Sequence, residues 1–233
     1  MSTFNQMEFA DFIRLMEIML GLAFIQSSLE HLTRQRVEQI LFCLRICLSI
    51  GLIGFTDNNI ILLSLLLLNI VQLHTFQGPY NGGSDRMGLL VLTCLTLINF
   101  IPSEAWQAIV LGYLAVQLTL SYFVSGWVKI TNKEWRTGRA LSDVFAFSAY
   151  PVSEQLRQFS NQPKLMAIMS WSVMGFELLF PLALLNQTAL ILALTIAALF
   201  HLANAFLFGL NRFFWIWLVA YPSLIWFQIE FFS

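Results

Sequence analysis

Charged residues are scarce in this chain of 233 residues, because Asp, Glu, Lys and Arg together make up only 11% of it. Soluble domains contain about 25% charged residues, so the shortage excludes an ordinary soluble globule. Hydrophobic residues instead account for 58% of the chain and give a mean hydropathy of +0.73. The net charge of −1 also lacks the basic excess that is typical of nucleic-acid-binding proteins. We therefore expect an integral membrane protein whose main partner is the lipid bilayer, with no nucleic acid bound.

Several recognisable site patterns are also missing. The three cysteines form no CxxC pair, and Cys43 and Cys47 have no histidine or carboxylate beside them in the sequence. We find no glycine-rich phosphate loop, no metal-ligand cluster and no Ser/His/Asp pattern, so no metal is predicted. Glu8 and Asp11 stand where a cleavable signal peptide has basic residues, and no such peptide is expected.

Long hydrophobic runs divide the chain into about eight segments. A helix of about 20 apolar residues crosses a bilayer; longer ones tilt, and shorter ones need local thinning of the bilayer. The predicted fold class is all-α: a polytopic integral membrane helical bundle with a single domain over residues 1–233. The first segment either spans or lies in the interface, and within it Arg14 and Glu17 can neutralise one another. The segments are residues 7–29, 40–55, 60–76, 87–101, 106–130, 165–185, 189–210 and 213–232.

The link over residues 132–164, between the fifth and sixth segments, is too long for a simple turn. Its apolar and charged residues alternate in a way that predicts one interfacial amphipathic helix on the membrane surface. The apolar positions are Trp135, Leu141, Val144 and Phe145, and the charged ones are Arg136, Arg139 and Asp143.

The basic residues predict how the chain crosses the membrane. Every link that contains Lys or Arg falls on one side of the predicted bundle, whereas the alternate links, around Asp57, Glu104 and Asn186, contain neither. The positive-inside rule places the basic links in the cytoplasm. Both termini, including the C-terminus, are then expected to be extracytoplasmic. The basic residues are Arg34, Arg36, Arg86, Lys133, Arg136, Arg139, Arg157, Lys164 and Arg212.

The run from Leu194 to Pro222 is apolar almost throughout, with three candidate polar residues set into it. His201, Asn204 and Asn211 are spaced i, i+3 and i+10, which places them on one face of a continuous helix. Polar groups are costly inside a bilayer, so this face is expected to look toward protein or a wet cavity. Two interpretations stay open: the three groups line a functional cavity, or they hold helices together through hydrogen bonds.

Lys129 ends the fifth segment, and Tyr122 and Ser125 share its helical face. Ionisable residues within spans are functional candidates by default. Either the ammonium group reaches outward to the membrane interface, or burial lowers its pKa and makes it a usable general base.

Glu177 lies deep in the sixth segment, one turn before Pro181. A carboxylate in that position needs a partner or a proton, and Arg45 and His201 are the candidate partners, although the sequence cannot pair them. Here too, a functional site and an ion pair that only ties helices together both stay open.

Two stretches resemble a known family. Residues 122–129, Tyr-Phe-Val-Ser-Gly-Trp-Val-Lys, followed by Trp135 and Gly138, resemble the Gly-x-x-Lys and Trp-x-x-Gly pattern of the vitamin K-dependent γ-carboxylases. The same pattern is typical of the wider horizontally transferred transmembrane (HTTM) domain family. The other similar stretches are residues 200–209 with Pro222 and, more loosely, residues 176–178 with Pro181.

The resemblance implies a helical membrane domain with a polar cavity, in which Lys129 deprotonates a vitamin K-like quinol. In the carboxylases, oxygen then generates a strong base, a glutamate side chain loses its γ-proton, and carbon dioxide adds. His201 and Asn204 would shape and polarise the cavity, and Glu177 is a further candidate catalytic residue. The remaining residues expected in the quinol or substrate site are Tyr122, Ser125, Trp135 and Arg45.

The chain departs from these enzymes in two ways. We expect it to lack the large extramembrane part that helps those enzymes to hold peptide substrates, and its lysine-to-tryptophan gap is about one residue longer. We expect a carboxylase-like HTTM membrane protein that binds a quinol and modifies a peptide or small substrate. The alternative is a non-catalytic membrane subunit or maturation partner of a larger complex, in which Lys129, Glu177 and His201 only hold helices together.

Overall fold

The computed structural model describes residues 7–32, 36–75, 83–148 and 154–232, and within these ranges the chain is helical without a strand. Among the described residues, five helices are long and apolar enough to cross a membrane. They are α1 (Phe9–Leu29), α5 (Glu104–Thr131), α9 with the 3-10 helix η3 (Pro163–Leu179 and Phe180–Leu185), α10 (Gln187–Phe208) and α11 (Asn211–Phe232).

Three further helices coincide with the remaining hydrophobic segments: α2 (Arg36–Gly54), α3 (Asn59–Thr75) and α4 (Gly83–Phe100). Large apolar side chains also cover much of the outer surface, with exposed fractions such as 80% for Ile60 and 78% for Phe206. Lipid is the solvent that accommodates such a surface. The all-α integral membrane class is confirmed, whereas the number of about eight spans stays a prediction.

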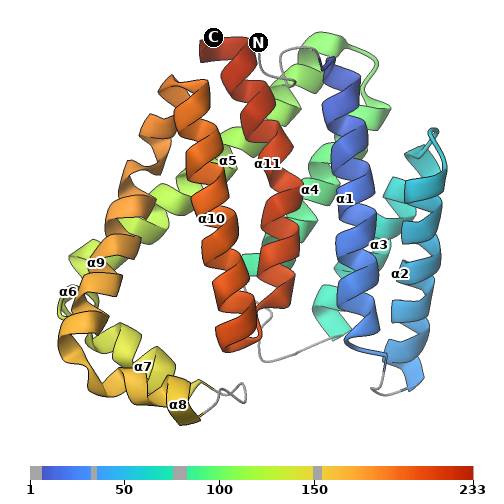
Figure 1. Cartoon of the computed structure of the whole chain (residues 1–233). Helices are drawn as coiled ribbons and strands as arrows, with labels where there is room; N and C mark the ends of the chain where they lie inside the picture. The colour runs from blue at the N-terminus through green and yellow to red at the C-terminus, as the bar shows by residue number, and fades with distance from the viewer. Residues whose placement is uncertain (1–6, 33–35, 76–82, 149–153, 233) are drawn as a thin grey trace. The chain divides into compact units, whose positions relative to one another are not determined.

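The helices fall into two compact units. Unit 1 comprises residues 1–115 and 211–231, and unit 2 comprises residues 116–210 with 232–233. Helix α5, which is labelled in Figure 1, therefore begins in unit 1 and ends in unit 2. The single domain over residues 1–233 stays a prediction.

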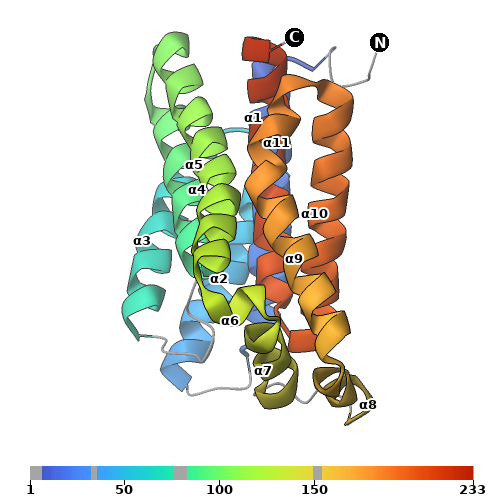
Figure 2. The same cartoon turned by 90° about the vertical axis from the view of Figure 1, so that its left-hand side faces the viewer.

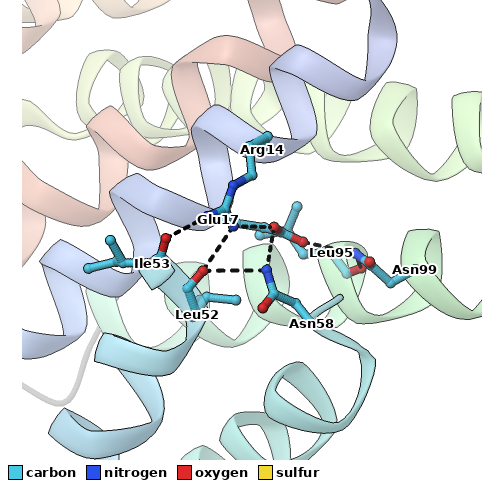
Figure 3. A network of polar contacts seen from close by, with 7 residues as sticks. All are labelled: Arg14, Glu17, Leu52, Ile53, Asn58, Leu95 and Asn99. Atoms are coloured by element: carbon cyan, nitrogen blue, oxygen red, sulfur yellow. Dashed lines mark hydrogen bonds and ion pairs between the residues drawn. The ribbon is translucent and has the colours of Figure 1, made fainter. Parts of the chain in front are cut away.

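In unit 1, helices α1 to α4 pack one against the next, α1 on α2, α2 on α3 and α3 on α4, and α1 also touches α4. A buried network of polar groups joins their ends, as Figure 3 shows. Glu17 accepts hydrogen bonds from Arg14 (3.1 Å), Asn58 (2.8 Å) and Asn99 (3.1 Å). The predicted neutralisation of Arg14 by Glu17 is confirmed.

Arg14 also completes the C-terminal end of α2. Its guanidinium donates to the carbonyls of Leu52 (2.9 Å) and Ile53 (2.5 Å), which have no helical partner because α2 ends at Gly54. The cationic group is also favourable at the negative end of the helix dipole. A charged residue in the first hydrophobic segment is thus accounted for by helix capping.

The alternation predicted one amphipathic helix in the link between α5 and α9 of unit 2. The link does not form one continuous helix. It is broken into α6 (Lys133–Arg136), α7 (Arg139–Phe147), α8 (Glu154–Arg157) and η2 (Gln158–Asn161), and residues 149–153 lie outside the described part. Gly138 breaks the helix because its φ of 80° is left-handed. Figure 2 shows α6 and α7 at one end of α9. Phe145 of α7 packs there against Met166 and Phe208; an interfacial position for the link stays a prediction.

The run from Leu194 to Pro222 is not a continuous helix either. Helix α10 ends at Phe208, where Gly209 takes a left-handed φ of 68°. The amides of Gly209 and Leu210 donate back to carbonyls of the last turn. Asn211 begins α11 in unit 1, where its side chain donates to Glu30 at 2.7 Å. The prediction that Asn211 shares a helical face with His201 is therefore wrong, because a glycine C-cap separates them.

Candidate functional site

The polar centre of unit 2 is an ion pair between α5 and α9, the Lys129–Glu177 pair. Lys129 Nζ lies 2.6 Å from each carboxylate oxygen of Glu177, and the side chains are only 16% and 6% exposed. Lys129 therefore turns inward to a carboxylate. The expectation that Arg45 or His201 is the partner of Glu177 is wrong, because this lysine occupies both of its oxygens.

Two neighbours complete the surroundings of the pair. Ser125, one turn before Lys129, accepts from Nζ at 2.6 Å and donates to Glu177 Oε1 at 3.1 Å. The Trp135 ring lies 5.4 Å from Nζ, a cation–π distance. Three of the residues predicted for the site, Ser125, Trp135 and Glu177, thus surround Lys129.

Gly126 explains how α5 and α9 come close enough for this contact. A Cβ on Gly126 would lie 2.9 Å from the backbone nitrogen of Leu178 and 3.0 Å from Glu177 Cβ. Small residues let membrane helices approach closely at such points. The glycine three residues before the lysine therefore brings the carboxylate within reach of the ammonium group.

His201 belongs to a second polar contact on the same face of α5. Its Nε2 lies 3.0 Å from the hydroxyl of Tyr122, and both side chains are buried. The Tyr122 ring stacks on Phe180 at 4.1 Å between centroids and meets Phe176 edge-on at 6.2 Å. Because Tyr122 stands three residues before Ser125 and seven before Lys129, the two polar contacts adjoin along one helical face.

The Trp-x-x-Gly element docks the link onto α9. The carbonyl of Trp135 accepts from Ser170 Oγ at 2.5 Å, and the carbonyl of Arg136 accepts from the Trp171 indole at 3.0 Å. A Cβ on Gly138 would lie 2.5 Å from the backbone nitrogen of Ala167. The element therefore holds Trp135 where its ring faces Lys129.

Two predicted site residues lie elsewhere. Asn204, one turn after His201, is half-buried, and its carbonyl accepts from the Leu210 amide in the C-cap of α10. Arg45 lies in α2, and its hydrogen bonds stay within unit 1, to Ser27, Ser28 and Gln72. The structure therefore does not bring Arg45 to the Lys129–Glu177 pair through any described bond.

Sequence reasoning missed polar residues of unit 1 that border a cavity of about 460 Å³. Asn99 and Gln107 line it beside Arg14 and Glu17, and Asn58 bonds to Glu17 behind them. Asn204 was singled out because it is an asparagine in an apolar helix. The same signal could have identified Asn99. Among the described residues, no group of three or more His, Cys, Asp or Glu gathers as a metal site needs.

The comparisons with known proteins agree with the pattern around Lys129. The family model described as the HTTM domain matches residues 101–230, which is more than half of the chain. No curated protein and no solved structure matches the chain. The match covers Lys129, Glu177 and His201 and leaves out α1 to α4. The chain therefore belongs to the HTTM domain family.

Proposed function

We propose that this HTTM protein binds a lipid-soluble quinol in unit 2 and uses the Lys129–Glu177 pair to take up its hydroxyl proton. The reaction would serve to modify a peptide or another small substrate. The observation that carries the proposal is the buried pair itself, with Nζ 2.6 Å from both carboxylate oxygens. Ionisable groups are rare within membrane spans and cluster at functional sites there.

The pair can exchange a proton internally. Movement of one ammonium proton along a 2.6 Å bond to Glu177 leaves a neutral amine and a carboxylic acid. The amine can then accept a proton from a hydroxyl, after which the pair has gained one proton and one positive charge. Ser125 bonds to both partners and keeps the amine and the carboxylic acid in place.

The side chains beside the pair include groups that suit an aromatic diol. The rings of Tyr122 and Phe180 stack on one another and Phe176 meets Tyr122 edge-on, and because Tyr122 and Phe180 are 4% and 2% exposed, a quinol ring would have to part them to pack there. The Tyr122–His201 contact adds a hydroxyl and an imidazole for a polar substituent. A bound quinol would supply the reducing equivalents for the reaction.

A second candidate function rests on how completely the pair is satisfied. Lys129 donates to Ser125 and to both oxygens of Glu177, and Gly126 presses the two helices together at that point. Such a pair can serve as a helix tie alone. The protein would then be a non-catalytic membrane subunit or a maturation partner of a larger complex.

Four variants separate the two functions: Lys129→Met, Glu177→Leu, the double variant, and Lys133→Met as a control at an exposed lysine on the following turn. Each is purified in detergent with vitamin K hydroquinone as the probe. Oxidation of the quinol by dissolved oxygen is followed by absorbance, retained quinone by mass spectrometry of an extract, and stability by thermal unfolding.

For the enzyme we expect quinol oxidation to fall about 10²-fold or more in Lys129→Met and in the double variant, because a general base is lost. The double variant should nevertheless regain stability, because two apolar side chains replace the charges. Lys133→Met should match the wild type. Absence of turnover in the wild type, or recovery of turnover in the double variant, would assign the pair to the scaffold instead.

A further inference from the structure

A second buried polar centre lies in unit 1 around Arg45 of α2, which is only 8% exposed. Its guanidinium donates to Ser28 Oγ (2.7 Å), Ser27 Oγ (2.6 Å) and Gln72 Oε1 (2.9 Å). Two aromatic rings, those of Phe24 and Phe42, each lie 5.2 Å from its Cζ. Every hydrogen-bond partner of this cation is therefore neutral. We call these groups, with the residues that line the adjacent cavities, the Arg45 cluster.

No Asp or Glu side chain among the described residues forms an ion pair with Arg45. All 13 acidic residues lie in the parts that the structure describes, and none of them is within the 4.0 Å ion-pair distance of this guanidinium. Asp85 is paired with Arg212 at 3.1 Å instead. The described lining thus holds two guanidinium groups and one carboxylate, an excess of one positive charge. Burying a charge without a partner is unfavourable, and an anion would offset it.

Two small cavities adjoin the cluster, with volumes of about 30 Å³ and about 20 Å³. Arg45, Asn69, Asp85 and Arg212 line both of them. A water-sized atom needs roughly 10–15 Å³ of such space, so together they have room for about three to five heavy atoms. A carboxylate group, with its three heavy atoms, is within that range. The cavities lie near the surface of unit 1, because the side chains of Asp85 and Arg212 that line them are 20% and 17% exposed.

Two buried polar atoms of the lining have no hydrogen-bond partner among the described residues: Gln72 Nε2 and Ser84 Oγ. Gln72 lines the smaller cavity and Ser84 the larger one. Because Gln72 Oε1 accepts from Arg45, which has donors only, the orientation of the amide leaves Nε2 as a donor. Gln72 Nε2 and Ser84 Oγ are unused donors beside Arg45, which has no ion-pair partner among the described residues. A ligand with several hydrogen-bond acceptors would satisfy them.

We infer that the Arg45 cluster binds a carboxylate group, held by Arg45, Gln72 and Ser84 in the paired cavities of unit 1. Guanidinium groups match the planar, two-oxygen geometry of a carboxylate. The inference does not rest on the proposed function, because the cluster lies in unit 1 and mostly outside the residues that the HTTM family model matches. The carboxylate has two possible sources, a free small acid or the head of a fatty acid from the bilayer.

Sodium formate is the probe for this site. The full-length protein in detergent micelles is unfolded by heat while formate replaces chloride at constant ionic strength. Ser84→Ala is the informative variant, because it removes a hydroxyl without a partner and is expected to fold like the wild type. Ser49→Ala is its matched control: Ser49 Oγ is also buried without a partner, but it lines neither cavity.

We expect the unfolding midpoint to rise with formate and to saturate, because a ligand that binds only the folded state stabilises it. Ser84→Ala should need about tenfold more formate for the same rise, since a hydrogen bond to a charged ligand is lost. Ser49→Ala should follow the wild type. Oleate acting at far lower concentration than formate would identify a fatty acid, and similar potency would identify a free acid.

Three results would overturn the inference. Equal midpoints in formate and chloride would mean that water fills the cavities. An unchanged formate response in Ser84→Ala would remove the cavities from the binding site. A rise with phosphate but not with formate would point to another anion.

Discussion

At the residue scale, Gly126 decides how close Lys129 and Glu177 come to one another. The backbone of Leu178 lies where a side chain on residue 126 would be. A Cβ there would be 2.9 Å from the amide nitrogen of Leu178. Backbone atoms cannot turn aside as a flexible side chain does. The Gly-x-x-Lys spacing therefore has a packing reason that is separate from any chemistry of the lysine.

We predict that Gly126→Ala destabilises the protein by roughly 1–3 kcal/mol, the usual cost of overpacking, because α5 and α9 must move apart. Gly175→Ala, on α9 itself, is the control, because a Cβ there has nothing within 4 Å. It should be neutral or stabilise by up to about 1 kcal/mol, the helix-propensity gain over glycine. Denaturation of both variants in detergent checks this; equal stabilities would show that the close approach is not limiting.

At the element scale, the link between α5 and α9 is held by its backbone as much as by its side chains. Gly138 is left-handed, and Ser170 and Trp171 of α9 bond to the carbonyls of α6. Phe145 then fixes α7 against Met166. The break between α6 and α7 thus lets two short helices face α9, which one straight helix would not allow.

Gly138→Ala should therefore loosen this link. The left-handed conformation costs a non-glycine residue about 1–2 kcal/mol, and the new Cβ would also meet the Ala167 backbone. Limited proteolysis of the variant should cut the link faster than in the wild type. Gly54→Ala, with open space around its Cβ, should digest like the wild type. Equal cleavage of Gly138→Ala and the wild type would contradict the prediction.

At the scale of the whole molecule, the side of the membrane on which each link lies is a prediction from the basic residues. Helix α9 with η3 is long enough to span, and Lys164 and Thr188 stand exposed near its two ends. We predict that Lys164→Cys reacts with an impermeant thiol reagent from the cytoplasmic side and Thr188→Cys from the opposite side.

The labelling requires a background in which the three native cysteines are replaced by alanine, because Cys43 and Cys47 are exposed. Intact and inverted membrane vesicles then report the two sides separately. Reaction of both positions in the same vesicle orientation would refute the predicted topology, or the spanning of α9.

The amino-acid sequence alone was enough to locate the hydrophobic helices and to identify a membrane protein, although it did not locate every helix end. Hydrophobic runs are local, and the bilayer requires each of them to satisfy its backbone groups internally, so the helices follow directly. The Arg14–Glu17 contact was predictable for the same reason, because one helical turn brings the two residues together. The resemblance around Lys129 and Gly126 led to the HTTM family in the same way.

Only the tertiary structure decided which polar groups meet. Glu177 was expected to pair with Arg45 or His201, but the close approach at Gly126 gives it to Lys129, while Arg45 remains within unit 1. Asn58 and Asn99 reach Glu17 from positions 41 and 82 residues away in the chain. Such partners depend on how helices pack in three dimensions, and no periodicity along the sequence contains that information.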